Sequence, residues 1–256
     1  MAMKMVEMER ALKQLRLSGI RATLETRILE AKSSKLDFME VFSSLVQDEL
    51  DRRQSSTGER RYKLSGLPER KSYDEFDWTF NPKIPKKSCF ELLTIKFIAE
   101  GFCPILIGPP GTGKSHIAKS IAYKAIRDGY VVVYGEDEEL LSKVSVTTDL
   151  ARKKIMKQIV ESDLVVFDDL FLQRKLSGEL TQILQLILHK RYRARRSTLI
   201  TSNRIVKDWD QFLGDNAMAS SLYDRLLHRG IPLQFEGKSY RLKEASLRLA
   251  NGKTNQ

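Results

Sequence analysis

The chain is poor in several residue types, and each shortage excludes a class of protein. Its 256 residues include two cysteines, Cys89 and Cys103, whose spacing is not that of a metal site. One of them lies beside a predicted buried strand, so we expect reduced thiols and a cytoplasmic location. No apolar run approaches the ~18 residues of a membrane-spanning helix, so we expect no membrane partner.

Acidic residues are missing from one long stretch of the chain. Between Leu180 and Lys207 there are seven basic residues and no acidic one. The net charge of +11 lies almost entirely beyond residue 79, because residues 1–79 hold 15 Lys/Arg against 14 Asp/Glu. Such an excess predicts a polyanionic partner, with nucleic acid first, although a solvated basic surface would have the same composition. The seven residues are Lys190, Arg191, Arg193, Arg195, Arg196, Arg204 and Lys207.

The composition, 41% hydrophobic and 30% charged, is that of a folded domain with a small appendage. Apolar residues at helical spacing predict a helical module over residues 1–62, whose apolar faces could form a core or bind a partner helix. Residues 63–88 predict a linker that packs on the following domain, residues 89–256. The linker is expected to bury the aromatic side chains of Tyr73, Phe76 and Trp78.

Apolar strand-like segments alternate with amphipathic helical segments in the main domain. This alternation predicts an α/β fold with a parallel sheet covered by helices on both faces. Strands are expected at residues 103–107, 131–134, 164–167, 197–201 and 231–235. Helices are expected at residues 90–98, 137–145, 149–161, 178–194 and 217–228, and another after residue 113.

The segment 108–115 reads GPPGTGKS and matches the phosphate-loop pattern G-x-x-x-x-G-K-[ST]. Between a strand and a helix, such a loop directs backbone N–H groups and the helix dipole toward a polyphosphate. Lys114 would reach the β- and γ-phosphates, and the Ser115 hydroxyl would bind Mg²⁺. The sequence therefore predicts a nucleotide site. Its contacts are expected from Gly108, Pro109, Pro110, Gly111, Thr112, Gly113, Lys114, Ser115 and His116.

Further candidate residues follow the later strands. Asp168, at the end of an apolar strand, is expected to bind Mg²⁺ directly or through water, and Asp169 to act as general base on the attacking water. Asn203, after the next strand, could contact the γ-phosphate or that water. Arg225 or Arg229 could act on a neighbouring subunit's γ-phosphate, or be a surface or phosphate-contacting arginine.

Together these motifs resemble the AAA+ ATPases of the IstB/DnaC group, with IstB, the helper ATPase of a bacterial insertion-sequence family, the nearer match. The likeness extends over nearly the whole chain. It includes the linker LPERKSYDEFDW, the Thr-Ser-Asn ending at Asn203, the stretch DRLLHR and the closing GKSYRL.

The resemblance implies a sheet of order 5-1-4-3-2, ATP and Mg²⁺ as cofactors, Asn203 as the sensor-1 residue and Arg225 as an arginine finger acting on a neighbouring subunit. It also implies ATP-dependent assembly into a ring or helical filament on double-stranded DNA, target-site selection and recruitment of a partner transposase. DNA contacts are then expected from the basic cluster at 190–207 or from a second cluster. The second cluster is Lys143, Lys153, Lys154 and Lys157.

Two features depart from the AAA+ pattern. Asp169 stands where glutamate is usual, so we expect slow hydrolysis suited to a switch. Only about 20 residues follow the last predicted strand, so we expect neither a C-terminal helical lid nor an arginine from a lid at the nucleotide.

Three other functions share parts of this pattern. A helicase loader of the DnaC type would use the same core, bind a replicative helicase and prefer single-stranded DNA. A small-molecule kinase would need an acceptor pocket and a lid, which the sequence does not predict. A nucleotide-gated scaffold would bind ATP without hydrolysing it.

Overall fold

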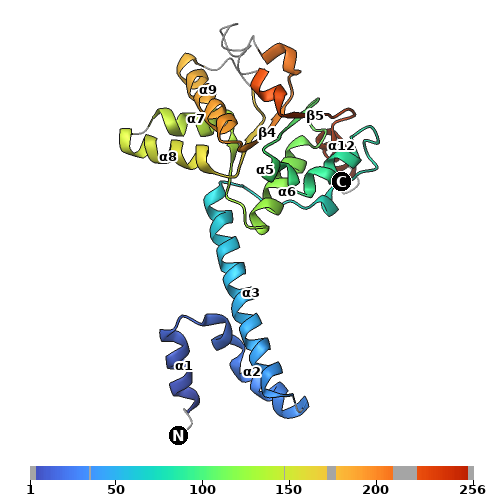
Figure 1. The fold of residues 1–256 in the computed structure, drawn as a ribbon. Helices are drawn as coiled ribbons and strands as arrows, with labels where there is room; N and C mark the ends of the chain where they lie inside the picture. The colour runs from blue at the N-terminus through green and yellow to red at the C-terminus, as the bar shows by residue number, and fades with distance from the viewer. Residues whose placement is uncertain (1–3, 35, 147, 172–176, 210–223, 253–256) are drawn as a thin grey trace. The chain divides into compact units, whose positions relative to one another are not determined.

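The computed structural model describes residues 4–34, 36–146, 148–171, 177–209 and 224–252 (Figure 1). The chain divides into two compact units, Met1–Arg61 and Tyr62–Gln256. Within the described residues, no helix is long and apolar enough to cross a membrane.

The N-terminal unit consists of helices α1 (Met5–Gln14) and α2 (Ser18–Ser34) and most of α3 (Phe38–Ser65). Glu49 of α3 caps the first turn of α2, because its Oε2 accepts the backbone N–H groups of Gly19 at 2.6 Å and Ile20 at 3.3 Å. Arg27 of α2 binds Asp48 of α3 through two hydrogen bonds of 2.9 and 2.8 Å. Polar contacts therefore join the two helices.

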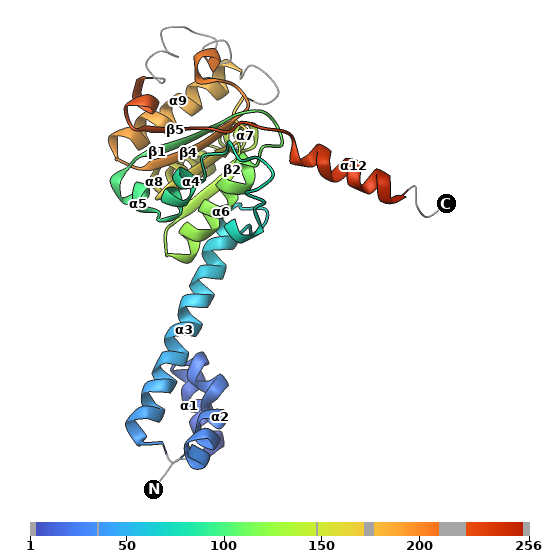
Figure 2. The ribbon, with the colours of Figure 1, turned by 90° about the vertical axis from the view of Figure 1, so that its right-hand side faces the viewer.

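The second unit contains a five-stranded parallel sheet of order β2-β3-β4-β1-β5 (Figures 1 and 2). This is the predicted order, read from the opposite edge. The strands are β1 (Cys103–Ile107), β2 (Val132–Glu136), β3 (Leu164–Asp168), β4 (Ser197–Ser202) and β5 (Gly230–Gln234). The side chains of β1, β3 and β4 are buried throughout. This burial explains the mostly apolar sequences of β1 and β3, whereas β4 also buries the hydroxyl side chains of Ser197, Thr198, Thr201 and Ser202.

Helices cover both faces of the sheet, and one apolar core lies under each layer. One face packs against α4 (Lys86–Leu93), α5 (Lys96–Glu100) and α6 (Lys114–Arg127). The opposite face packs against α7 (Asp137–Ser145), α8 (Asp149–Glu161) and α9 (Gly178–Arg193). Short 3₁₀ helices, η1 and η2, span Tyr73–Glu75 and Val206–Asp208, and α12 (Tyr240–Gly252) follows β5.

The segment before β1 departs from the predicted single helix at 90–98. It forms α4 and α5 instead, separated at Ile95, which adopts a left-handed backbone with φ 61° and is 2% exposed. Burial of the Ile95 side chain offsets a backbone conformation that is unfavourable for a β-branched residue. Residues 217–223 of the helix predicted at 217–228 lie outside the described residues. The remaining residues, 224–228, are helical.

The predicted linker lies against the apolar core that α4, α5 and α6 cover. Tyr73 is buried, and Phe76 and Trp78 are partly buried beside it, as the aromatic spacing predicts. The Phe76 and Trp78 rings have their centroids 4.5 Å apart, and the Tyr73 hydroxyl donates to the carbonyl of Cys89 at 2.9 Å. Both cysteines are buried free thiols, and burial raises the pKa of Cys89 to about 12.

Candidate nucleotide-binding site

The phosphate loop connects β1 to α6 at the carboxyl edge of the sheet. Gly111 and Gly113 have φ of 77° and 99°, values that a side chain would strain. A Cβ atom at Gly113 would lie 2.3 Å from the ring of Phe76, and one at Gly111 would lie 2.1 Å from the hydroxyl of Ser239. The loop is thus enclosed by the linker and by the segment that precedes α12.

Lys114 and Asn203 meet inside this loop. The Lys114 side-chain amine donates to the carbonyls of Gly108 and Pro109 and to Oδ1 of Asn203, at 2.7, 2.9 and 2.7 Å. All three acceptors are uncharged, and burial lowers the pKa of Lys114 to about 8. A polyphosphate would supply the negative charge that this buried amine lacks.

Asp168 ends β3 and is held from both neighbouring strands. Its Oδ2 accepts the hydroxyl of Tyr134 from β2 at 2.5 Å, and its Oδ1 accepts the hydroxyl of Thr201 from β4 at 2.6 Å. The Thr201 hydroxyl also accepts the backbone N–H of Asp169 at 2.8 Å. Sequence reasoning missed the role of Tyr134, because a tyrosine in an apolar strand resembles any other core residue.

Asp169 begins a tight turn after β3. Its backbone is left-handed, with φ 54°. Burial, followed by the nearby carboxylate of Asp168, raises the pKa of Asp169 above its usual value. The turn is fixed from the first residue of α7, because Oδ2 of the buried Asp137 accepts the backbone N–H of Phe171 at 2.9 Å. The backbone of Asp169 is therefore held beside the candidate magnesium ligand.

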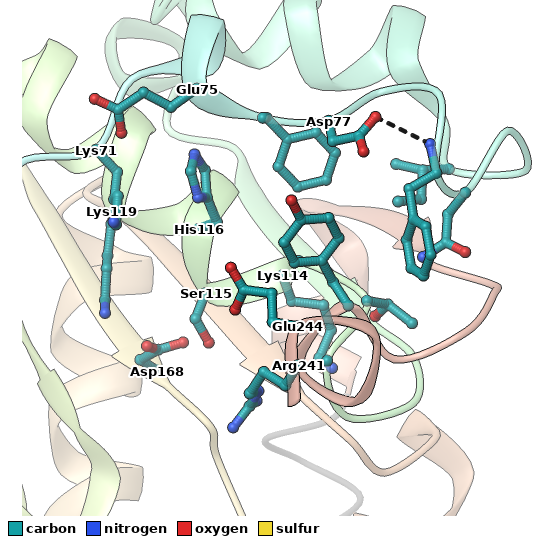
Figure 3. A pocket seen from close by; sticks show the side chains of 18 of the residues that line it. Lys71, Glu75, Asp77, Lys114, Ser115, His116, Lys119, Asp168, Arg241 and Glu244 are labelled. Carbon is teal, nitrogen blue, oxygen red and sulfur yellow. Dashed lines mark hydrogen bonds between the residues drawn. The ribbon is translucent and has the colours of Figure 1, made fainter. Parts of the chain in front are cut away.

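Three parts of the chain that lie far apart in the sequence enclose one cavity of about 480 Å³. They are the linker, the phosphate loop with α6, and α12. Figure 3 shows Ser115, Asp168 and Arg241 pointing toward this cavity from α6, β3 and α12. Asp169 and Lys114 line it as well.

Direct contacts bind these three parts to one another. His116 contacts the carbonyl of Ser72 through Nε2 at 2.9 Å, and Lys119 forms an ion pair with Glu69 at 2.8 Å. His116, predicted as a nucleotide contact, thus also holds the linker.

The segment before α12 is attached in the same way. The backbone N–H of Tyr240 donates to the carbonyl of Gly111 at 2.9 Å. The Asn81 side chain accepts the N–H of Lys238 and donates to its carbonyl, both at 2.9 Å. The loop therefore has fixed walls on two sides.

The cavity fits a nucleotide with magnesium in the chemistry of its donors. No cluster of three or more His, Cys, Asp or Glu able to hold a metal occurs in the part of the chain that the structure describes. Mg²⁺ would therefore need phosphate oxygens besides Ser115 and Asp168, which is its usual arrangement in proteins.

The C-terminal segment adds one residue that the sequence analysis did not assign to the site. No multi-helix lid follows β5 in the described residues, which end at 252. Arg241, in the first turn of α12, nevertheless lines the cavity. The sequence quoted as GKSYRL contains this arginine, but nothing in its spacing indicates where it lies.

Arg225 lies away from this cavity. It lines a separate small cavity of about 20 Å³ together with Arg196 and Arg229. The Arg229 guanidinium lies 4.9 Å above the Tyr192 ring and donates to the Tyr192 carbonyl at 3.3 Å. The structure therefore does not bring Arg225 to its own chain's phosphate loop.

The basic cluster at 190–207 is not one exposed surface. Arg191 is 1% exposed and donates to backbone carbonyls at the end of α8 and the start of β4, among them those of Ile159 and Ser162 at 2.7 and 2.9 Å. Burial lowers the pKa of Arg191 to about 9. Arg196 forms an ion pair with Asp163. The inclusion of Arg191 among DNA-contacting candidates is wrong, because this arginine joins elements of the core.

Two members of the second basic cluster, Lys153 and Lys157, line a groove between α8 and α9 with a volume of about 490 Å³, whereas Lys143 and Lys154 do not line it. The groove is lined by Arg152, Lys153 and Lys157 of α8 and by Lys190 of α9. Two acids, Asp149 and Glu161, line it as well.

The chain is similar to proteins encoded by insertion sequences. Residues 10–248 match the model of the family described as IstB-like ATP binding protein. The ATP-binding protein of insertion sequence IS21 from Pseudomonas aeruginosa is 30% identical over 241 residues, which cover 94% of this chain and 90% of that protein. That of insertion sequence IS5376 from Geobacillus stearothermophilus is 30% identical over 218 residues, covering 85% and 86%.

Solved structures share the fold. The crystal structure of DnaI matches with a TM-score of 0.55 and 18% identity, over 66% of this chain and 90% of that chain. The replication initiator DnaA bound to AMPPCP and single-stranded DNA matches with a TM-score of 0.52 and 19% identity, over 70% and 54%. At these identities the likeness shows the AAA+ fold alone.

Proposed function

Because this chain belongs to the family of IstB-like ATP-binding proteins and is an AAA+ ATPase, we propose that it assists DNA transposition by assembling on double-stranded DNA when ATP is bound. The family that the sequence resembles is thereby confirmed. Relatives along most of the chain are named for insertion sequences, and this is the observation that carries the proposal. Selection of target DNA and recruitment of a partner transposase are the steps it would serve.

The chain's own residues divide the chemistry of hydrolysis among them. When nucleotide binds, Lys114 would exchange its hydrogen bonds to the loop carbonyls for bonds to the β- and γ-phosphates. Asn203, whose Oδ1 lies 2.7 Å from this amine, would contact the γ-phosphate or the attacking water. Ser115 and Asp168 would hold Mg²⁺, and the ion would supply positive charge beside the phosphates. Asp169 accepts the proton of the attacking water. Its short side chain and its fixed backbone support slow turnover, as a switch requires.

Arg225 is the residue that we assign to the neighbouring subunit's nucleotide. It is half-buried and lies outside its own chain's nucleotide cavity. Arg229 already stacks on Tyr192, so it is the poorer candidate. An arginine that completes another subunit's site would make ATP a bridge between subunits, and assembly would then depend on nucleotide.

The groove between α8 and α9 is the surface that we assign to DNA. Lys153 and Lys157 are exposed there, and Lys157 lies 3.9 Å from Glu161, a loose pair that would exchange readily for a phosphate. The two acids in the groove reduce its net charge but leave four cations against two. Contacts with DNA phosphates release counterions, so binding should weaken steeply as salt rises.

Sedimentation tests the proposal directly. The full chain with duplex DNA and a non-hydrolysable ATP analogue should form a large assembly, and Arg225→Ala should remain small while still binding the analogue. Arg127→Ala, an exposed arginine on α6, is the matched control and should assemble normally. Monomers of the unmodified chain under all conditions would refute the proposal. Preferential assembly on single-stranded DNA, with capture of a replicative helicase rather than a transposase, would favour a helicase loader.

A further inference from the structure

Tyr134 occupies a special place beside the candidate magnesium ligand. β3 lies between β2 and β4 in the sheet, and Tyr134 pairs in register with Val166, two residues before Asp168. Residues two apart on a strand share a face, so Tyr134 and Asp168 point to the same side. The tyrosine is 5% exposed, and its hydroxyl donates to Oδ2 of Asp168 at 2.5 Å.

We propose that Tyr134 is a positioning residue for Mg²⁺, acting through the carboxylate of Asp168. The inference rests on the proposed role of Asp168 as the magnesium ligand. An ionised carboxylate has about four lone-pair sites. Tyr134 uses one on Oδ2 and Thr201 one on Oδ1, which fixes the plane of the group. The remaining sites are thereby directed at Mg²⁺ or its waters.

The hydroxyl of Tyr134 can be separated from its ring. The ring packs in the core cluster that α6 covers, and phenylalanine would keep that packing. Thr201 is a less clean probe, because its hydroxyl also accepts the N–H of Asp169 at 2.8 Å. The hydroxyl of Tyr134 has Asp168 as its hydrogen-bond partner in the described residues, so its removal changes the support of one carboxylate oxygen.

The chain offers a matched control in Tyr73. This tyrosine is also 5% exposed, belongs to the same core cluster and donates one hydrogen bond, to the carbonyl of Cys89 at 2.9 Å. Tyr73→Phe therefore removes a buried hydroxyl of the same kind without touching Asp168.

The experiment measures binding of a non-hydrolysable ATP analogue to the full chain by calorimetry, in a Mg²⁺ titration and again in EDTA. Tyr134→Phe should raise the Mg²⁺ concentration needed for half-maximal tightening by about 10-fold, a common effect of losing a residue that supports a metal ligand. Its affinity in EDTA should stay unchanged. Tyr73→Phe should match the unmodified chain in both conditions.

Asp168→Asn supplies the coupling test. If Tyr134 acts through Asp168, adding Tyr134→Phe to Asp168→Asn should cause little further loss. Additive losses, an unchanged Mg²⁺ response, or an equal loss in EDTA would each overturn the inference. Thr201→Val, which frees the other oxygen, should shift the Mg²⁺ response in the same direction and provides a second route if Tyr134→Phe folds poorly. An unmodified chain that binds the analogue independently of Mg²⁺ would instead refute the proposed role of Asp168.

Discussion

The two units of this chain are held together by different physical means. In the N-terminal unit, the described residues that are buried are Gly19, Leu24 and Glu49. Polar contacts organise its helices, while α3 exposes large apolar side chains at four-residue spacing. These are Phe38, Phe42, Val46 and Leu50, exposed by 75, 50, 38 and 55%.

The second unit has an apolar core on each face of its sheet, and its nucleotide site lies at the edge between them. Burial of apolar surface is its main source of stability. The comparison predicts that the effect of a substitution depends on the unit in which it lies. Those in the sheet should act on folding and nucleotide binding together, whereas those in the N-terminal unit should act locally.

The largest effect is expected in the core of the second unit. Phe167 of β3 is 0% exposed, and Phe167→Ala should lower the free energy of unfolding by about 3–5 kcal/mol, through lost transfer energy and a cavity. Hydrogen exchange on the full chain should show faster exchange throughout β1, β3 and β4, with α1 and α2 unchanged. Equal acceleration in α2 would show that the two units unfold together and would break the comparison.

The next effect concerns nucleotide binding. Lys114→Ala removes the buried amine and should weaken ATP-analogue affinity about 100-fold, the scale of a charge-assisted hydrogen bond to phosphate. Calorimetry is the measurement, with Arg127→Ala as the control that should bind normally. Hydrogen exchange in residues 5–34 should not change, and a slowing or acceleration there would contradict independent units.

A smaller effect should follow from the cap of α2. Glu49→Ala leaves the N–H groups of Gly19 and Ile20 without their acceptor, so the start of α2 should exchange faster and thermal unfolding of the N-terminal unit should shift downward by a few degrees. Glu40→Ala is the control, because Glu40 accepts the N–H of Asp37 at the exposed start of α3. Both variants should keep the nucleotide affinity of the unmodified chain. A lower affinity with Glu49→Ala would show that the N-terminal unit is energetically coupled to the nucleotide site.

The smallest effect is a dependence on acid. The Arg27 guanidinium lowers the pKa of Asp48 from 3.8 to about 2. The ion pair therefore stabilises the folded N-terminal unit fully at pH values above 3.8. The contribution of the ion pair to stability should be lost as the pH falls through the folded-state pKa of about 2. Nuclear magnetic resonance of the Asp48 carboxyl carbon should report the shifted titration, and Arg27→Leu should return it toward 3.8. An identical titration in the variant would rule out the ion pair as the cause.

Much of the second unit could be predicted because its local signals agree with its fold. Strand-like runs placed the five strands within a few residues, and the phosphate-loop pattern marked the turn between β1 and α6. The break at Ile95 could not be predicted, because no glycine or proline marks it and the side chain's burial imposes the left-handed backbone. Tertiary packing decided that position.

The missed residues share a different cause. Counting charges cannot separate Arg191, which is enclosed by carbonyls, from exposed neighbours such as Arg193. Arg241 and Tyr134 reach the site through contacts between distant segments, which residue spacing does not encode. A motif predicts the residues of one loop, whereas the residues that other segments add must be found in the folded chain.

The segment after β5 in the second unit limits where the chain can be shortened. Ser239 fills the space beside Gly111, and the backbone N–H of Tyr240 donates to the carbonyl of that glycine. The Asn81 side chain forms two hydrogen bonds with the backbone of Lys238. A fragment designed to stop at the last strand would retain a complete sheet yet expose one side of the loop to solvent. Purification handles and reporter fusions therefore belong at the C-terminal end of the chain, after the residues that form this wall.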